Sequence, residues 1–449
     1  MPQTASRVRA LDRESALGRF SANRERTRAL FEMLDAEMYY ERPIPLRNPV
    51  VFYEGHVPAF SVNTLIKNAL GRPGIDAHLE RIFARGIDPA TEATAVARGN
   101  PTWPSREAVR AYVEAADEAI ESAIGSADLE RDGHRLLDRA QALWTILEHE
   151  EMHQETLAYI WHQVPYARKR PPAGYVTLTP GSATPDLAAR VRVPGGVVTL
   201  GTDPDAVDFA WDNEQPAHVR AVEPFTIDVH NVTNGQFLAF VDAGGYRDPA
   251  WWRDEDWAWV QGEGVTHPFF WERAENVWHW RGMFERVPLP ETWPVYVSWA
   301  EARAYARWRG RRLPTEAQYH RAAFGTPDGR ERSSAWGEDA GADPPANVDF
   351  VRWDPEPVGA HPESASAFGV HDLVGNGWEW TGTPFAPFDG FVPLPSYPEY
   401  SADFFDDNHF VMKGASPVTP RALVRRGFRN WFRPRYPYAY ATFRCVGPA

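Results

Sequence analysis

Residues 133–163, GHRLLDRAQALWTILEHEEMHQETLAYIWHQ, decide the fold of the first part of the chain. The stretch is rich in Leu, Ala, Glu and Arg, so it predicts one long helix. Residues 10–38 place apolar side chains at helical spacing, and residues 59–70 and 106–123 also read as helices. Four helices within residues 1–165 predict a helical bundle.

The rest of the chain has a different composition. The proline-rich stretch RPIPLRNPV, residues 42–50, predicts an extended connector between the first two helices. Residues 166–190 are rich in Pro and Gly and predict a linker. Residues 191–449 contain much Gly, Pro and Trp with short periodic segments, and one helix is expected at 298–309, where Ser298 and Glu301 form a capping box. The fold class is therefore expected to be α+β.

A histidine pair stands in LEHEEMHQET, residues 147–156. His149 and His153 are four residues apart, so a helix places them on one face where both rings can reach one ion. Carboxylates can orient metal-binding imidazoles by hydrogen bonds, so the acidic neighbours in this stretch favour a metal site. They are Glu148, Glu150, Glu151 and Glu155. Two surface histidines on a charged helix are the simpler alternative.

The same residues also spell H-E-x-x-H, which is typical of zinc proteases. That motif needs a third ligand downstream, yet position 156 is Thr where the longer pattern has Gly, and no Glu occurs between Glu155 and Glu214. A zinc hydrolase is therefore disfavoured. His56 in VFYEGHVPAFSVN is a better third ligand, with His134 and His162 as competitors. Three neutral histidines leave positions open on an octahedral iron for substrate and oxygen.

The overall charge restricts the partners. The formal net charge is −14 without a Lys-rich run, which argues against nucleic acid and anionic membranes. A basic cluster interleaved with aromatic residues at 421–444 suits a small anionic ligand at least as well as a polymer. The single cysteine, Cys445, excludes an intramolecular disulfide and a cysteine-based metal cluster. Without a signal peptide or an apolar run of membrane length, a cytoplasmic protein is expected. The sequence does not indicate an oligomeric state.

Several motifs in the second half resemble a known family when they are taken together with His56 and the histidine pair. They are VPGGVVTLGT (193–202), NEQPAHVRAVEPFTID (213–228), VTNGQFLAF (232–240), PVYVSWAEARAYARWRGRRLPTEAQYHRAA (294–323) and FGVHDLVGNGWEWT (368–381). The combination resembles the ergothioneine-pathway sulfoxide synthases over nearly the whole chain. This resemblance implies a DinB-like four-helix bundle followed by a formylglycine-generating-enzyme-like domain with a C-type-lectin-like core. One cysteine excludes the cysteine-pair chemistry of the true formylglycine-generating enzymes.

The resemblance also implies a reaction and a set of site residues. Members bind Fe(II) through three histidines, which by motif would be His56, His149 and His153, and use O2 to couple a sulfur donor to C2 of the imidazole of hercynine. The segment FRNW, residues 428–431, matches the part that holds hercynine. Its Asn430 offers amide hydrogen bonds and its Trp431 a π face for a quaternary ammonium. The remaining expected substrate contacts are Phe432, Arg433, Tyr436 and Met152.

A catalytic tyrosine is also implied, to supply a proton or an electron. Tyr397 and Tyr400 are the predicted candidates, and Tyr438 and Tyr440 are alternatives. Sequence spacing alone does not choose among these four.

Two positions depart from the mycobacterial-type members, which use γ-glutamylcysteine. Those members have Asp directly after FRNW and Arg four residues later, where this chain has Phe432 and Tyr436. The run YYERPIPLRNPVVFYEGHVPAF, residues 39–60, looks closer to the selenoneine-synthase branch, which uses a selenosugar. We therefore expect a carbon–selenium bond between a selenosugar and hercynine, with a cysteine-containing thiol as the alternative donor. A non-catalytic protein whose lectin-like domain binds a ligand is a further alternative.

Overall fold

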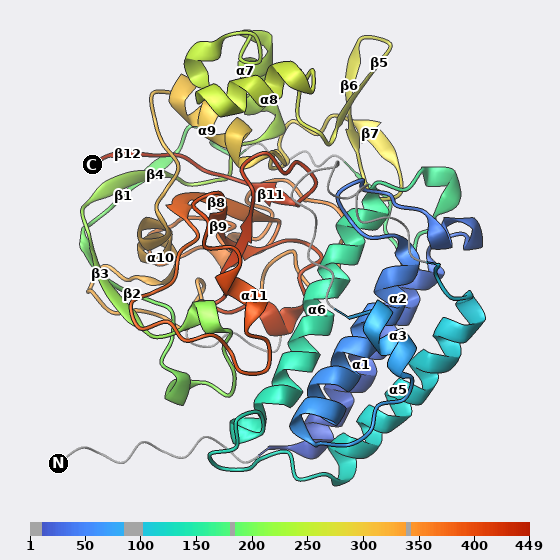
Figure 1. The fold of residues 1–449 in the computed structure, drawn as a ribbon. Coiled ribbons are helices and arrows are strands. Elements are labelled where there is room, and N and C mark those ends of the chain that lie inside the picture. The colour runs from blue at the N-terminus through green and yellow to red at the C-terminus, as the bar shows by residue number, and fades with distance from the viewer. Residues whose placement is uncertain (1–10, 85–101, 180–184, 338–342) are drawn as a thin grey trace, which may run out of the picture. The chain divides into compact units, whose positions relative to one another are not determined.

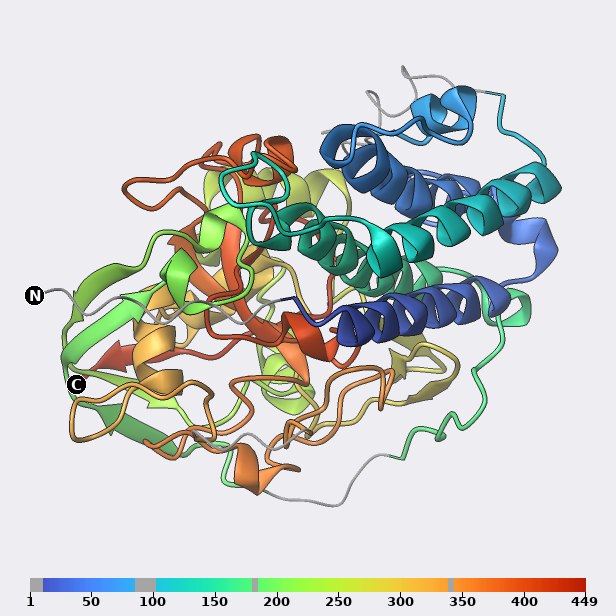
Figure 2. The same ribbon diagram turned by 90° about the horizontal axis from the view of Figure 1, so that it is seen from below.

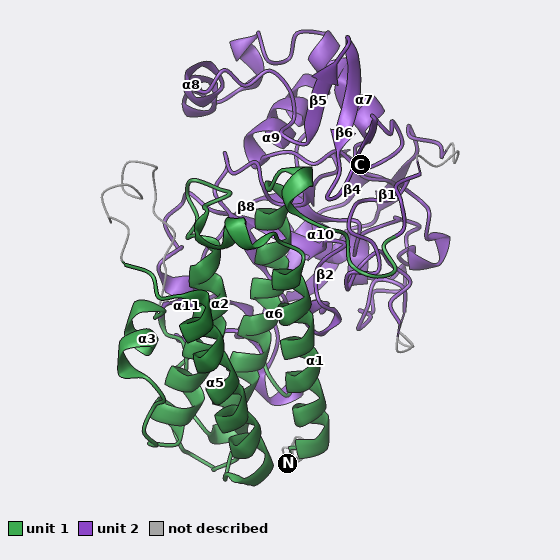
Figure 3. Ribbon diagram, turned by 90° about the vertical axis from the view of Figure 1, so that its right-hand side faces the viewer, with its two compact units in different colours: residues 1–175, 207–209, 394–398 green, residues 176–206, 210–393, 399–449 purple. Residues whose placement is uncertain are grey.

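The computed structural model describes residues 11–84, 102–179, 185–337 and 343–449. The chain divides into two compact units (Figure 3). Unit 1 comprises residues 1–175, 207–209 and 394–398, and unit 2 comprises residues 176–206, 210–393 and 399–449. The domain boundaries expected at residues 165 and 191 stay a prediction. Among the described residues, every helix is too short or too polar to cross a membrane.

Unit 1 is a helical bundle whose long helices lie side by side (Figures 1 and 2). Its helices are α1 (Arg13–Glu32), α2 (Val50–Ser61) with its π-helical continuation η2 (Val62–Ala69), α3 (Ala77–Ile82), α5 (Arg106–Ser126) and α6 (Gln141–His162). Apolar side chains from α1, η2, α5 and α6, including Phe20, Leu65, Ile120 and Leu143, form its core. The bundle expected from the apolar periodicity is confirmed.

Two helix boundaries differ from the sequence-based expectation. The second helix begins at Val50 and not near Ala59, because Pro49 occupies its N-cap position with an extended backbone. Pro58 lies inside this helix, which continues into the π-helical turns from Val62. His56, which precedes the helix expected at 59–70, is therefore a residue of α2.

The last bundle helix begins at Gln141 and not at Gly133. The two preceding residues, Arg139 and Ala140, have φ angles of 53° and 55°, which no right-handed helix accommodates. After this helix the chain still packs on unit 1, since the Lys169 ammonium donates to the carbonyls of Trp161 and His162 at 2.9 Å. The first part of the predicted linker thus caps the end of the helix.

Unit 2 contains small sheets and short helices. One sheet has the order β10 (Asn430–Phe432), β9 (Phe410–Ala415), β8 (Gly377–Pro384), β11 (Ala441–Thr442), and another has β1 (Arg190–Val193), β4 (Phe225–Asp228), β12 (Val446–Pro448). The others are β2 (Gly196–Leu200) with β3 (His218–Val222), and β5 (Trp271–Ala274), β6 (Val277–Arg281), β7 (Arg286–Pro288). The helices are α7 (Asn234–Asp242), α8 (Asp254–Gly262), α9 (Trp299–Trp308), α10 (Glu316–Phe324) and α11 (Glu399–Ala402). A helical bundle followed by this mixed unit confirms the α+β class.

Buried polar contacts hold the elements of unit 2 together. The predicted capping box at α9 is present, with the Ser298 N–H donating to Glu301 Oε2 at 2.8 Å and the Glu301 N–H donating to Ser298 Oγ at 3.3 Å. Near the C-terminus, the fully buried Arg444 guanidinium forms a two-point ion pair with Glu379 of β8 at 2.6 and 2.7 Å. Such a pair fixes the geometry of both chain segments.

Candidate metal centre

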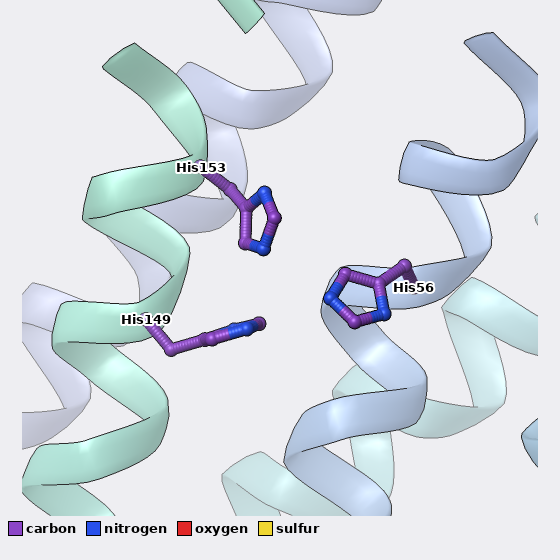
Figure 4. A group of neighbouring side chains, drawn as sticks. All are labelled: His56, His149 and His153. Atoms are coloured by element: carbon purple, nitrogen blue, oxygen red, sulfur yellow. The ribbon is translucent and has the colours of Figure 1, made fainter. Parts of the chain in front are cut away.

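Three histidines of unit 1 converge on one point (Figure 4). His56 extends from α2, while His149 and His153 extend from adjacent turns of α6. One ligand nitrogen from each ring lies within 4.8 Å of the other two. The four-residue spacing predicted from the sequence places the α6 pair on one face, with ring centroids 4.5 Å apart.

His56 is oriented by a backbone carbonyl. Its Nδ1 lies 2.8 Å from the carbonyl oxygen of Phe83, so Nδ1 carries the proton and Nε2 keeps its electron pair. The Phe83 ring packs against Gly55, where an added Cβ would lie 2.4 Å from ring carbons. Phe83 is 27 residues from His56, and no sequence signal pointed to its role. This carbonyl–imidazole contact is the usual outer-shell support of a metal-binding histidine.

The two α6 histidines lie among aromatic rings, with His149 buried and His153 half-buried. His149 stacks on Phe60 with ring centroids 3.6 Å apart, and His153 lies 6.0 Å from the Tyr53 ring. The Nδ1 atoms of His149 and His153 are buried and have no hydrogen-bond partner among the described residues. Buried polar atoms nearly always have a partner, so these orphaned nitrogens fit a group that the protein itself does not supply.

Burial keeps the three rings neutral. It lowers the pKa of His56 to about 4. Burial also holds the pKa of His149 and of His153 well below the ordinary value, and the neighbouring histidines lower both further. A neutral imidazole offers an electron pair, which a metal ligand needs. Three such nitrogens in a buried site fit a borderline transition-metal ion.

Two acidic neighbours of the histidine pair, Glu150 and Glu151, are directed to α1 and not to the imidazole rings. Glu150 accepts hydrogen bonds from Arg24 and Thr27 of α1, both at 2.6 Å. Glu151 forms a two-point ion pair with Arg19, also of α1. The expectation that these carboxylates orient the imidazoles is therefore wrong for both, since neighbours one or two residues along a helix point to another face. Glu150 is also the residue that a zinc protease would use as its base, so its position argues against that class.

Of the four candidate tyrosines, Tyr397 belongs to unit 1, and the other three belong to unit 2. The Tyr397 ring lies 6.0 Å from His149 and 5.1 Å from Phe60. The neighbouring Ser396 hydroxyl is 2.7 Å from the Thr145 hydroxyl, one turn before His149 on α6. The structure thus brings together residues that are about 250 positions apart in the chain.

The competing histidines have other roles. The His134 Nδ1 accepts hydrogen bonds from the N–H groups of Leu136 and Leu137 and so stabilises a turn. His162 is buried near the end of α6, and its carbonyl accepts from Lys169. Met152 lies on α6 directly before His153 and is half-buried. Neither competitor belongs to the three-histidine group found among the described residues.

The other predicted site residues lie in unit 2. Tyr400 is buried and stacks on Trp211 at 4.0 Å. Trp431 stacks on Phe385 with centroids 4.2 Å apart and an angle of 6° between the rings. The Asn430 carboxamide oxygen accepts a hydrogen bond from the backbone N–H of Trp431 at 2.8 Å, which fixes one end of the Asn430 side chain.

The two positions expected to determine the donor are in contact with each other. Phe432 and Tyr436 stack with centroids 4.7 Å apart and an angle of 13°. Arg433, between them in sequence, is half-buried. The alternative tyrosines also lie in aromatic clusters, Tyr438 against Tyr436 and Tyr440 against Tyr296. The stacked pair presents an aromatic surface where the mycobacterial pattern has opposite charges.

Two family models match the chain. The Sulfatase-modifying factor enzyme 1-like domain matches residues 176–449, and the DinB superfamily matches residues 19–157. These matches correspond to the mixed unit and to the bundle.

Characterised relatives match over nearly the full length. A hercynine oxygenase of Mycolicibacterium smegmatis is 33% identical over 432 residues, covering 94% of this chain and 96% of that protein. A hercynine oxygenase of Mycobacterium tuberculosis is 34% identical over 413 residues, covering 92% and 93%. Ergothioneine biosynthesis protein 1 of Neurospora crassa is 28% identical over 505 residues, covering 92% of this chain and 55% of that protein.

Proposed function

Because the chain belongs to the ergothioneine-pathway sulfoxide synthase family of hercynine oxygenases, we propose that it uses Fe(II) and O2 to attach a chalcogen donor to C2 of the hercynine imidazole. The observation that carries this proposal is the group of three converging, neutral histidines in unit 1, of which His56 and His149 are buried and His153 is half-buried. Fe(II) suits these ligands, and an octahedral ion would keep positions open for substrate and oxygen.

The protein's own residues would have separate tasks at this centre. His56, His149 and His153 would hold the ion, and the Phe83 carbonyl would keep His56 in the tautomer that binds through Nε2. When bound, iron would supply the reaction with dioxygen that amino-acid side chains lack. The aromatic rings around the histidines would limit the access of water. We assign Tyr397 as the proton donor, acting through its phenolic oxygen, because its ring lies beside His149.

The residues of the FRNW segment would bind hercynine. Trp431 offers an electron-rich face to the trimethylammonium group, and the stack on Phe385 holds the indole in place. Asn430 would donate from its amide nitrogen, since its oxygen already accepts from the Trp431 N–H. Both roles follow from the family motif.

For the donor, we propose a selenosugar, with a cysteine-containing thiol as the alternative. The stacked pair Phe432 and Tyr436 supports this choice. Aromatic rings offer no charge to the ammonium and carboxylate groups of a glutamyl donor, whereas they pack well on the apolar faces of a sugar.

One experiment tests both levels of the proposal. The purified protein is incubated with Fe(II), O2, hercynine and either 1-selenoglucose or γ-glutamylcysteine, and products are read by mass spectrometry. We expect a hercynine–selenium conjugate from the selenosugar. Product with γ-glutamylcysteine but none with 1-selenoglucose would refute the selenium donor. The absence of product with both donors would refute hercynine coupling.

The metal assignment has its own test. We expect the His149→Ala, His153→Ala double variant to lose stoichiometric iron and turnover together, as measured by metal analysis and product formation. His78→Ala is the matched control, since His78 is exposed on α3 and contacts Arg81. Turnover retained in the double variant would disprove the ligand assignment.

A further inference from the structure

Unit 2 contains a cavity of about 310 Å³ beside α10 and β9. Phe324, Trp336 and Val374 contribute apolar walls, and Lys413 of β9 contributes a charged group. This volume is at the lower end of the range for small-molecule sites. Apolar walls with a few polar groups are also typical of such sites.

Lys413 is a buried cation. It is 2% exposed, and its ammonium donates to the carbonyls of Arg426 at 2.9 Å and Phe428 at 2.5 Å. An ammonium has three N–H donors, so one remains. Among the residues that the structure describes, no carboxylate lies within ion-pair distance of this nitrogen. Glu316 and Glu214 are close enough to favour the charged ammonium, but each already forms an ion pair, with Arg429 and Arg425 respectively. A further anion would therefore offset the cost of burying this charge.

The other cations of the cavity are already paired. The arginine–carboxylate contacts are Arg421 with Asp343, Arg425 with Glu214, and Arg426 with Glu331. These pairs neutralise the guanidinium groups, so the charge of Lys413 is the one that the cavity leaves without a carboxylate in the described part of the chain.

Trp336, which also lines the cavity, carries a second unused donor. The Trp336 indole N–H is buried and has no hydrogen-bond partner among the described residues. An indole N–H can only donate. The ammonium and the indole therefore both require an acceptor, and a carboxylate oxygen satisfies either one.

We propose that this cavity binds a small carboxylic acid with an apolar body, held by the Lys413 ammonium and the Trp336 N–H. The apolar body would contact Phe324 and Val374. Burial lowers the pKa of Lys413 to about 8, and an anion beside the ammonium would raise it again. Arg421, Arg425 and Arg426 belong to the basic, aromatic-rich cluster at 421–444, whose composition suits a small anionic ligand at least as well as a polymer.

The proposed acid site uses other side chains than the proposed iron chemistry, and its one link to the FRNW segment is the hydrogen bond from Lys413 to the backbone carbonyl of Phe428. The cavity is lined by residues of unit 2, and none of them is a histidine of the metal centre or a residue of the FRNW segment. A protein that failed to couple hercynine would therefore still be expected to bind the acid, and the reverse also holds.

Calorimetric titration of the full-length protein with benzoate, and with the uncharged benzamide, tests the charge requirement. We expect saturable benzoate binding, with benzamide bound at least about tenfold more weakly because it lacks the charge-assisted hydrogen bond. Lys413→Met should weaken the binding of benzoate to the same degree. Lys169→Met is the matched control, because Lys169 is also buried and also donates to two carbonyls, and it should leave benzoate affinity unchanged.

A measurement on the unaltered protein covers the case in which Lys413→Met does not fold. Burial lowers the pKa of Lys413 to about 8, so a part of these side chains is neutral near pH 8 and benzoate should bind there with proton uptake. Titrations in buffers of different ionisation enthalpy measure this uptake, which should nearly vanish at pH 6. Absence of benzoate binding, or binding at pH 8 without proton uptake, would overturn the proposal.

Discussion

Tyr397 illustrates how a single residue can be selected by position. It shares the surroundings of His149 with the Phe60 ring, and the contact between Ser396 and Thr145 holds its segment on α6. Among the candidate tyrosines, the others lie in unit 2, where they pack against other aromatic rings. A proton donor must be near the reacting atoms, so proximity to the histidines is the property that matters.

We therefore predict that Tyr397→Phe lowers turnover by about 100-fold or more while iron affinity stays within a factor of about two. The phenyl ring keeps the packing on Phe60, so only the hydroxyl is lost. Turnover and anaerobic iron titration measure the two effects separately. Tyr40→Phe, at an exposed tyrosine of unit 1, is the control. Equal turnover of the two variants would contradict the assignment.

Glu150 gives a second prediction at this scale, since it distinguishes the oxygenase from a zinc hydrolase. Its carboxylate is buried against Arg24 and Thr27. We expect Glu150→Gln to lower the free energy of unfolding by about 3 kcal/mol, because Arg24 loses one buried counter-charge, and to leave iron content and turnover nearly unchanged. Chemical denaturation and product formation are the measurements. A loss of turnover by more than about 100-fold in folded protein would indicate a catalytic base instead.

At the scale of elements, the position of α2 determines whether His56 reaches the pair on α6. The sequence predicted His56 as the third ligand, first from its surroundings in VFYEGHVPAFSVN and then from the family motif, yet it placed the start of this helix near Ala59. The prolines caused the error, because Pro49 precedes the helix and Pro58 is tolerated inside it. Local propensity cannot show that tertiary packing, here on α5 and α6, offsets such a residue.

Other parts of the site were predictable to different degrees. The α6 pair followed directly from four-residue spacing. The carbonyl of Phe83 and the ring of Phe60 were not predictable, because apolar residues carry no signal that separates a core role from support of a metal ligand. The direction of Glu150 and Glu151 was mispredicted, since the acidic run contained no information about the facing arginines of α1.

The contact between α2 and Phe83 leads to a prediction about Gly55. A Cβ at this position would lie 2.4 Å from the Phe83 ring, so Gly55→Ala must displace that ring, and we expect the Phe83 carbonyl to move with it. We expect a loss of about 1–3 kcal/mol in unfolding free energy and weaker iron binding, because His56 loses its hydrogen-bond partner. Gly18→Ala on α1 is the control, since nothing lies within 4 Å of its Cβ position. That change should be neutral or stabilise by up to about 1 kcal/mol. Equal iron affinity in both variants would disprove the role of Phe83.

At the scale of the whole molecule, each unit has buried hydrophobic clusters of its own among the described residues. One cluster contains Phe20, Leu65 and Leu147 of the bundle, and another contains Phe225, Tyr319 and Val370 of unit 2. The proposed metal ligands all belong to the first unit, and the cavity with Lys413 belongs to the second. Each proposed ligand is therefore expected to stabilise a different unit, because binding to a folded state stabilises the part that provides the site.

This division predicts how iron affects unfolding. Under anaerobic conditions, Fe(II) at about 100 times its dissociation constant should stabilise the bundle by about 2.7 kcal/mol. For a unit of this size, that corresponds to a rise of roughly 5–10 °C in its melting temperature. Hydrogen exchange read on peptides of α2 and α6 should show the protection, while peptides of β8 and β9 should exchange as before. Benzoate should give the opposite pattern, with protection at β9 and α10. Iron that protected β8 and β9 as strongly as α6 would contradict the prediction, because the three imidazoles that would hold the ion all come from the bundle.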